Sequence, residues 1–249
     1  TTGRGIGQCY TDKIRRHGIR VGTILDGSFE QRFKAQSAAW QREIDAPEDA
    51  PFPDADPDLR RMADVLDELA PFIKDTREVI HAAAKADKEI LFEGAQGMLL
   101  DVDHGTYPFV TSSNTTIAGA FSGTGVFLDF KNRIGVLKAY TTRVGTGPFP
   151  TEQENAAGEA LQTKGGEFGA TTGRPRRCGW LDLPLVREAC ITNGYNAFVL
   201  TKLDVLTGLE TIPVATGRSA GGTPIYQDLP GWEEPLDHAR SDEDLPRNC

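Results

Sequence analysis

Nine consecutive residues, 169–177, carry two hydroxyls, two glycines and three guanidinium groups. Glycines let backbone N–H groups converge on an oxyanion, and guanidinium groups bind carboxylates or phosphates through paired hydrogen bonds. The segment therefore predicts a site for an anionic ligand, and a solvated basic turn is the alternative that the residues alone leave open. In order, the residues are Gly169, Ala170, Thr171, Thr172, Gly173, Arg174, Pro175, Arg176 and Arg177.

A second candidate follows an apolar run, where Thr201, Lys202, Leu203 and Asp204 come directly after residues 198–200. A buried strand of this kind delivers its last residues to the carboxyl edge of an open α/β sheet, where ligands bind. A carboxylate there can accept hydrogen bonds from N1–H and the 2-amino group of guanine, which adenine does not offer in that arrangement. Asp204 is therefore a candidate guanine-selecting residue, with an ordinary surface Lys–Asp pair as the alternative.

The chain begins with a third loop of this type, Thr-Thr-Gly-Arg-Gly-Ile-Gly, and Lys13, Arg15 and Arg16 follow on an expected helical turn. Glycines at alternate positions let amides approach a phosphate closely, so the loop favours phosphate binding. The Walker sequence Gly-x-x-x-x-Gly-Lys-Ser/Thr does not occur in the 249 residues. Because a loop normally sits between two elements, we interpret the sequence as an excerpt of a longer chain.

Polar residues are also dense between 93 and 116, a stretch that contains Gln96 and Thr111. A polar stretch between apolar strands generally lines a pocket. Asp103 and His104 suggest an acid–base dyad, since a neighbouring carboxylate tunes an imidazole toward neutral pH. A histidine held in a hydrogen-bonded turn is the alternative that we favour.

Two helices and a solvated connection are expected before these loops. Ser28 and Gln31 form a capping-box pattern, and apolar residues recur at helical spacing over 29–44 and again over 59–73. Between 46 and 58 the composition turns to Pro, Asp and Ala, which predicts a connection. We therefore expect 28–87 to form a small helical lobe, and we interpret residues 1–249 as the central portion of a single domain.

Short apolar runs at 89–92, 134–140 and 197–201 predict buried strands. Asp182 is expected to cap a helix that Gly194 terminates, so that helix, tight turn and strand form one α/β unit. We therefore expect an α/β fold with a mainly parallel central sheet flanked by helices.

Composition excludes several classes of protein. The chain has 36 acidic against 27 basic residues and a net charge of −9, which excludes the broad basic surface of a DNA- or RNA-binding protein. The four cysteines have neither metal-ligand spacing nor a dense disulfide pattern, which favours a reducing compartment. No apolar run approaches the ~20 residues of a membrane span, and no leader pattern opens the sequence, so we expect a cytoplasmic protein that binds metabolites.

Taken together and in order, seven motifs resemble the adenylosuccinate synthetase family. The resemblance extends from residue 1 to about residue 211 and continues weakly through 229–232. It implies a P-loop-NTPase-like ligase fold and a homodimeric enzyme of purine nucleotide biosynthesis. The motifs are Thr-Thr-Gly-Arg-Gly-Ile-Gly (1–7), Phe-Glu-Gly-Ala-Gln-Gly (92–97), Asp-His-Gly-Thr-Tyr-Pro (103–108), Thr-Ser-Ser-Asn-Thr-Thr (111–116), Thr-Arg-Val-Gly-x-Gly-Pro-Phe-Pro-Thr-Glu (142–152), Ala-Thr-Thr-Gly-Arg-x-Arg-Arg-x-Gly-Trp (170–180) and Thr-Lys-Leu-Asp (201–204).

A member of this family couples IMP to L-aspartate with GTP and Mg²⁺, giving adenylosuccinate, GDP and phosphate. The resemblance implies that GTP first phosphorylates the purine 6-oxygen and that the aspartate amine then displaces this phosphate. The family's catalytic Asp and His have no counterpart among these 249 residues. No residue of this chain is therefore assigned as catalytic or as a metal ligand, and the chain alone is expected to be inactive.

Matching motif positions also implies roles for individual residues. The aspartate loop is expected to comprise Ala170, Thr171, Thr172, Gly173, Arg174, Pro175 and Arg176. GTP is expected to contact Arg176, Lys202, Leu203 and Asp204. The IMP contacts implied are Thr2 and Thr111 with the phosphate, Gln96 with the base region, the Val144 carbonyl with the ribose, Arg174, and Arg16 donated across a homodimer interface.

Two positions depart from the family pattern, because Gln8 replaces a common proline and Pro175 replaces an often basic residue. Two other functions stay open on the sequence. A phage-type ligase that joins aspartate to dGMP, a 2-aminoadenylosuccinate synthetase, shares much of this architecture. A non-catalytic nucleotide-binding module is the alternative from another class.

Overall fold

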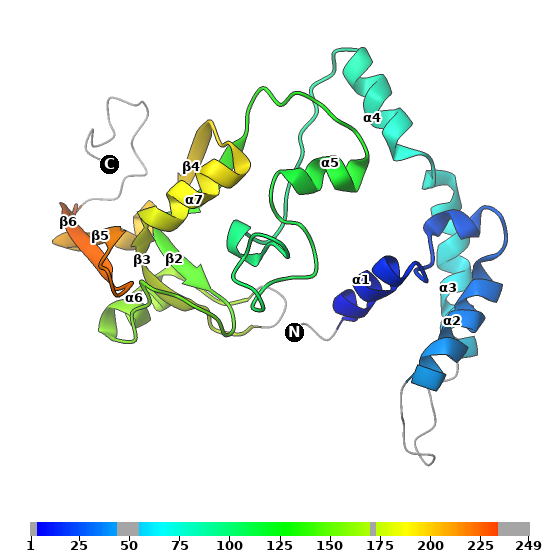
Figure 1. Ribbon diagram of the computed structural model, residues 1–249, viewed down its shortest axis with the longest axis horizontal. Helices are drawn as coiled ribbons and strands as arrows, with labels where there is room; N and C mark the ends of the chain where they lie inside the picture. Colours follow the sequence, from blue (N-terminus) through cyan, green and yellow to red (C-terminus); the bar gives the residue numbers. More distant parts are fainter. Residues whose placement is uncertain (1–3, 44–54, 170–172, 234–249) are drawn as a thin grey trace. The chain divides into compact units, whose positions relative to one another are not determined.

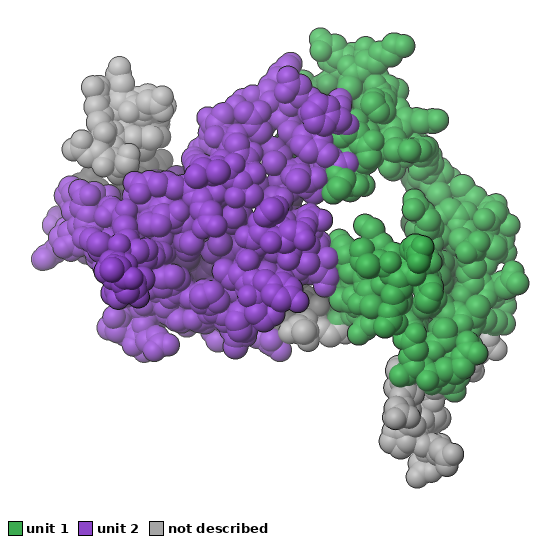
Figure 2. Space-filling view, in the orientation of Figure 1, with its two compact units in different colours: residues 1, 3–93, 122–126 green, residues 2, 94–121, 127–249 purple. Residues whose placement is uncertain are grey.

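The computed structural model describes residues 4–43, 55–169 and 173–233. These residues divide into two compact units, which Figure 2 distinguishes by colour. The first unit holds the described residues up to Glu93 together with 122–126. The second unit holds 94–121 and the described residues from Phe127 onward, and it contains every strand found among the described residues.

The first unit is helical (Figure 1). Asp75 caps its last helix, because Asp75 Oδ1 accepts a hydrogen bond from the N–H of Arg77 at 2.9 Å. Two of its helices, α2 and α3, pack against each other. The elements are α1 (Ile6–Arg15), the 3₁₀ turn η1 (Val21–Ile24), α2 (Phe29–Glu43), α3 (Ala55–Leu69), the 3₁₀ turn η2 (Ala70–Phe72) and α4 (Thr76–Lys85).

The first predicted helix is found as α2, whereas the second differs from its prediction at both ends. Helix α3 begins at Ala55, inside the expected connection, and ends at Leu69. Pro57 fits the first turn because the N–H groups there have no intrahelical acceptor. Pro71 cannot continue the helix, so the chain changes to η2. That 28–87 forms a lobe within one domain stays a prediction.

The strands of the second unit form two sheets (Figure 1). In the first sheet, β1 (Ile134–Lys138) and β4 (Ala197–Thr201) pair in parallel. The second sheet has four strands, and only its central pair, β3 with β5, is parallel. Its order is β2 (Tyr140–Arg143), β3 (Arg177–Asp182), β5 (Thr211–Arg218) and β6 (Pro224–Pro230).

The expected α/β class is confirmed, and the parallel pairs are β1–β4 and β3–β5. The antiparallel β5–β6 pair has a local cause, since the short turn at 219–223 joins the two strands as a hairpin. The strand predicted at 89–92 is wrong: no strand is found there, and Leu91 is 89% exposed. Within the described ranges no neighbouring strand pairs with this segment, so its backbone cannot form a ladder.

Two helices cover the four-stranded sheet. Helix α6 (Ala156–Gly165) packs against β3, and α7 (Leu183–Asn193) packs against β5. Asp182 caps α7 and Gly194 ends it in the left-handed conformation, as the sequence predicts. The shorter elements are η3 (Met98–Leu100), α5 (Ala118–Thr124) and η4 (Leu203–Leu206).

The core lies between α6, the sheet and η4. Its buried members come from all three, and Trp180 and Trp232 are half-buried against it. In the parts of the chain that the structure describes, none of the helices has the length and apolar character needed to cross a bilayer. The buried core residues are Ala139, Tyr140, Leu161, Cys178, Val205, Leu206, Ile212 and Val214.

Candidate functional site

The predicted anion loop is closed at its base by a short antiparallel stem. Phe168 and Pro175 form a β-bridge, and the N–H of Gly169 donates to the carbonyl of Arg174 at 2.8 Å. Gly173 adopts φ 61°, a left-handed conformation that glycine reaches without a Cβ penalty. Arg174 is exposed at the stem. The predicted aspartate-loop residues Ala170, Thr171 and Thr172 lie outside the described residues.

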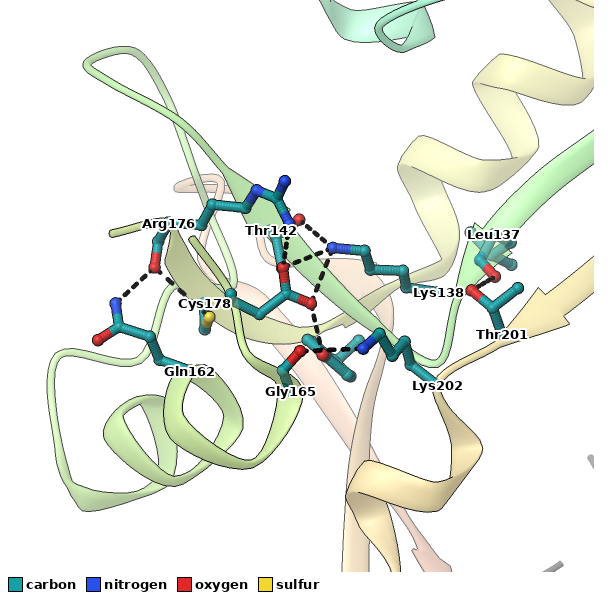
Figure 3. Close-up of polar contacts among 11 residues, drawn as sticks. Leu137, Lys138, Thr142, Gln162, Gly165, Arg176, Cys178, Thr201 and Lys202 are labelled. Carbon is teal, nitrogen blue, oxygen red and sulfur yellow. Dashed lines mark hydrogen bonds and ion pairs between the residues drawn. The ribbon is translucent and has the colours of Figure 1, made fainter. Parts of the chain in front are cut away.

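Arg176 follows this stem and is held by both its backbone and its side chain. Its N–H donates to the carbonyl of Glu167 at 2.9 Å, and its Nη1 donates to Glu167 Oε2 at 2.7 Å. Its own carbonyl accepts a hydrogen bond from Gln162 Nε2 at 2.7 Å. Figure 3 shows Arg176 and Lys138 directed toward the same point beside Thr142. The position of Arg176 is therefore fixed from three sides.

Glu167 is the centre of this group, and its side chain is fully buried. Lys138 Nζ donates to both carboxylate oxygens, at 2.8 and 2.7 Å, and the Tyr140 hydroxyl donates to Oε1 at 2.5 Å. Burial by itself would raise the pKa of Glu167, but the hydrogen bonds from Lys138, Tyr140 and Arg176 lower it below its usual value. Burial and the bond to Glu167 raise the pKa of Tyr140, so the phenol stays protonated and acts as a donor.

The predicted guanine-reading segment, 201–204, contacts the turn 165–167, which also holds Arg176. Lys202 adopts φ 65° after β4, and its Nζ donates to the carbonyl of Gly165 at 2.9 Å (Figure 3). Leu203 packs against the core, whereas Asp204 is exposed in the first turn of η4. The exposed carboxylate is open to a ligand. The turn 165–167 therefore brings together Arg176 and Lys202, two residues that the sequence assigns to one nucleotide.

Asp101 organises the polar stretch that contains Gln96 and Thr111. Its buried carboxylate accepts four backbone N–H groups within 101–116. Burial by itself would raise the pKa of Asp101, but these four donors hold it at about 2. The donors are Asp103 N at 3.0 Å, His104 N at 3.0 Å, Thr115 N at 2.6 Å and Thr116 N at 3.1 Å.

This network bears on the predicted dyad and on the IMP contacts. His104 donates its N–H into the Asp101 turn, and the Asp103 carboxylate accepts from Asn114 Nδ2 at 2.8 Å. This is the hydrogen-bonded turn that the sequence analysis favours. Gln96 is exposed with φ 62°, and Thr111 is half-buried with its N–H bonded to the carbonyl of Leu100.

Arg143 joins the polar stretch to the loop after β2. Its Nη2 donates to Thr106 Oγ1 at 2.9 Å and to the carbonyl of Phe109 at 3.0 Å, while its other nitrogens donate to carbonyls of 146 and 148. Gly147 adopts φ 115°, which residues with a Cβ rarely reach, and a Cβ there would also meet Phe109 and the Arg143 guanidinium. Val144, the predicted ribose contact, follows Arg143 and is 47% exposed. Arg143 of β2 lies opposite Arg177 of β3. The polar stretch and the arginine loop therefore adjoin the same four-stranded sheet.

Two further IMP contacts are predicted outside the described part of the second unit. Arg16 belongs to the first unit, where it caps α1 with φ 64° and is exposed. Thr2 lies outside the described residues. The roles assigned to all of these residues stay predictions.

Sequence reasoning missed Glu167, Asp101 and Arg143. Each makes contacts with residues far away in the sequence. Arg143, for example, donates to Thr106, 37 positions earlier. Asp101 alone has a local signal, because a carboxylate that accepts N–H groups two and three residues onward is typical of a turn.

Comparison with known proteins gives one consistent family. A family model described as adenylosuccinate synthetase matches residues 1–249. The chain is 47% identical to the adenylosuccinate synthetase of Streptomyces griseus, covering 100% of this chain and 62% of that protein. It is 46% identical to that of Desulforudis audaxviator, covering 99% of this chain and 61% of that protein.

A solved structure, described as fully ligated adenylosuccinate synthetase from Plasmodium falciparum, matches with a TM-score of 0.91 and 36% sequence identity. The match covers 100% of this chain and 63% of that structure. The chain therefore spans a little over three fifths of the length of these relatives.

Proposed function

The chain belongs to the adenylosuccinate synthetase family, and from this premise we propose that the protein joins L-aspartate to IMP at the expense of GTP, giving adenylosuccinate, GDP and phosphate. The reaction proceeds through 6-phosphoryl-IMP, because phosphorylation turns the purine 6-oxygen into a leaving group that the aspartate amine can displace. The chain spans 62% of its Streptomyces griseus relative. These 249 residues alone are accordingly proposed to bind substrates without turning them over.

One observation carries the proposal. Arg176 and Lys202 are anchored on the same turn, 165–167, so the arginine loop and the segment with Asp204 lie side by side. A guanidinium group binds phosphate or carboxylate, and an exposed carboxylate reads the two N–H groups on the edge of guanine. Adjacent sites of these two types suit a guanine nucleotide next to an amino acid.

The polar stretch around Asp101 suits the second nucleotide. Four backbone N–H groups locked by Asp101 make 101–116 rigid, and Arg143 ties this stretch to the loop that begins at Val144. Thr111 is therefore proposed as an IMP contact on a preorganised surface, and Gln96, which precedes this stretch, as a second IMP contact. Arg16 is proposed to complete the site of a second subunit in a cytoplasmic homodimer.

Among the described residues, no three His, Cys, Asp or Glu side chains form a group that could hold a metal ion. Mg²⁺ is usually bound through one or two carboxylates together with substrate phosphates, so it is proposed to enter the site with GTP. Asp101 is the buried carboxylate of the polar stretch, and both its oxygens are taken by backbone N–H groups. We therefore assign no step of the reaction to a metal held by the described residues.

The proposal is tested with Asp204→Asn in the gene product that contains these 249 residues. The amide presents an N–H₂ group in place of one acceptor, so the KM for GTP is expected to rise by about tenfold or more, and discrimination against xanthosine triphosphate to relax. Asp228→Asn, an exposed change on β6, is the matched control and is expected to keep wild-type constants. An unchanged nucleotide preference in Asp204→Asn would contradict the guanine-selecting role.

Substrate exchange separates the remaining functions. Formation of product from IMP, but not from dGMP, supports the synthetase. Product from dGMP would identify the phage-type ligase, whereas GTP binding without turnover by the gene product would identify a nucleotide-binding module.

A further inference from the structure

Glu167 has no ligand role in the proposed function, yet it is one of the most completely buried charged residues of the second unit. Its carboxylate accepts hydrogen bonds from three elements: β1 through Lys138, β2 through Tyr140 and the end of the arginine loop through Arg176. A buried carboxylate is stable only when such donors compensate its desolvation. These contacts connect the sheet to the loop that is proposed to bind aspartate.

We propose that Glu167 is a positioning residue, which holds Arg176 and the stem of the arginine loop in the orientation that aspartate and GTP require. The inference rests on the proposed function for the identity of the ligands. Glu167 is not one of the residues that are proposed to contact aspartate or GTP.

Glu167 bonds to the arginine loop through both its backbone and its side chain. Its carbonyl accepts the Arg176 N–H at 2.9 Å while its side chain accepts Arg176 Nη1 at 2.7 Å. Directly beyond it, the Phe168–Pro175 bridge and the Gly169–Arg174 hydrogen bond continue the stem. Glu167 therefore closes the loop at its base, and the orientation of the Arg176 guanidinium depends on the same residue.

The carboxylate of Glu167 also balances the charges of two cations. Lys138 and Arg176 bring two positive charges to one carboxylate, so the cluster keeps a net charge of about +1 toward a bound anion. Each carboxylate oxygen accepts two donors: Oε1 from Lys138 and Tyr140, and Oε2 from Lys138 and Arg176. A glutamine has only one acceptor oxygen, and its N–H₂ group would face two donors. Glu167→Gln therefore releases Arg176 or leaves it beside an uncompensated Lys138.

The turn that contains Glu167 also contacts the guanine-reading segment. Lys202 Nζ donates to the carbonyl of Gly165, two residues before Glu167 (Figure 3). A Cβ on Gly165 would collide with the Tyr140 hydroxyl, so the turn 165–167 can adopt this geometry only with glycine at its start. One turn thus positions a residue assigned to GTP on one side and the arginine loop on the other. Loosening it is expected to affect both substrates.

Glu167→Gln and Tyr140→Phe, in the gene product that contains this chain, form the matched pair. Both change the same buried group, but Tyr140→Phe removes only one donor to the carboxylate and leaves the bonds between Glu167 and Arg176 in place. Both are expected to lower the melting temperature. Only Glu167→Gln is expected to raise the KM for aspartate by about tenfold and the KM for GTP by a smaller factor, with kcat within about threefold of wild type.

Hydrogen–deuterium exchange supplies a readout that does not need activity. The amides of Gly169, Gly173 and Arg176 are bonded within the loop and its base, so they should exchange at least about tenfold faster in Glu167→Gln than in Tyr140→Phe. Glu167→Asp keeps the charge but withdraws it by one methylene, and it serves in place of Glu167→Gln if that variant does not fold.

The outcomes separate the two proposals. Equal KM values and equal exchange in the Glu167 and Tyr140 variants would overturn the positioning role. If the wild-type protein forms no adenylosuccinate, the proposed function fails, and the exchange rates alone decide whether Glu167 positions the loop.

Discussion

Asp101→Asn tests whether a single carboxylate organises the polar stretch 101–116. The four N–H groups that converge on Asp101 hold its pKa at about 2, against an ordinary value of 3.8. This difference of roughly two pKa units corresponds to about 2 to 3 kcal/mol of folding free energy at neutral pH. Because the folded-state pKa is the lower one, the contribution is complete above about pH 5 and is lost as the pH falls toward 2.

The amide variant removes both the charge and one acceptor. Its oxygen can still serve two of the four N–H groups, but its N–H₂ group leaves the other two without a partner. We expect Asp101→Asn to lower the free energy of unfolding by about 2 to 4 kcal/mol at pH 7. The difference from wild type should shrink by about 1 kcal/mol at pH 3, where roughly half of the ionisation-linked stability of the wild type is gone.

Urea unfolding followed by far-ultraviolet circular dichroism at the two pH values measures this difference. Asp129→Asn is the matched control, since Asp129 is exposed, and its effect should stay within about 0.5 kcal/mol at both pH values. A difference between Asp101→Asn and wild type that does not change with pH would refute the reasoning, because the N–H groups would then not favour the ionised form.

Two further predictions concern the turn and the loop. Gly165→Ala places a methyl group against the buried Tyr140 hydroxyl, so it should lower the free energy of unfolding in urea by about 1 to 3 kcal/mol. In the control Gly123→Ala the new methyl group meets no atom within 4 Å, so stability should not fall. Equal stability of the two variants would contradict the predicted collision. Arg174→Leu should raise the KM for aspartate by about tenfold or more. Arg187→Leu, an exposed change on α7, should leave this KM unchanged. Unaltered aspartate saturation in Arg174→Leu would show that Arg174 does not bind aspartate.

The parts of the fold that the sequence predicts well are those governed by local interactions. Helix α7 begins where Asp182 accepts an N–H three residues onward and ends at Gly194 in the left-handed conformation. Both signals act within one helical turn, so they can be recognised from adjacent residues. The strand β4 is found where a short apolar run after a tight turn predicts it, but four of its five residues are exposed, so the expected burial is wrong.

The errors arise where non-local pairing decides. The residues at 89–92 have the composition of a buried strand, but a strand also needs a neighbour to complete its hydrogen bonds, and composition does not specify the neighbour. The mixture of parallel and antiparallel pairs in the second sheet also depends on pairing between segments far apart in the sequence. Strand β2 comes one residue after β1, yet it pairs with β3, which lies beyond α6 in the sequence.

The same limit applies to the candidate site. The sequence identifies the arginine loop and the segment at 201–204 from residue types alone, but it does not indicate Glu167, whose side-chain donors lie 29, 27 and 9 positions away. No pattern within a few residues of Glu167 reports such contacts. They follow from the packing of α6 against β3 and from the register of β2 with β3.

The three arginines of the loop motif show why residue type alone overstates an anion site. Arg177 forms a bidentate pair with Glu152 and donates to the carbonyls of Gly145 and Gly147, so its charge and its geometry are used within the fold. Arg176 shares Glu167 with Lys138, which compensates for part of the charge that the carboxylate removes. The positive charge at the base of the loop therefore depends on a lysine from β1 that no loop motif contains.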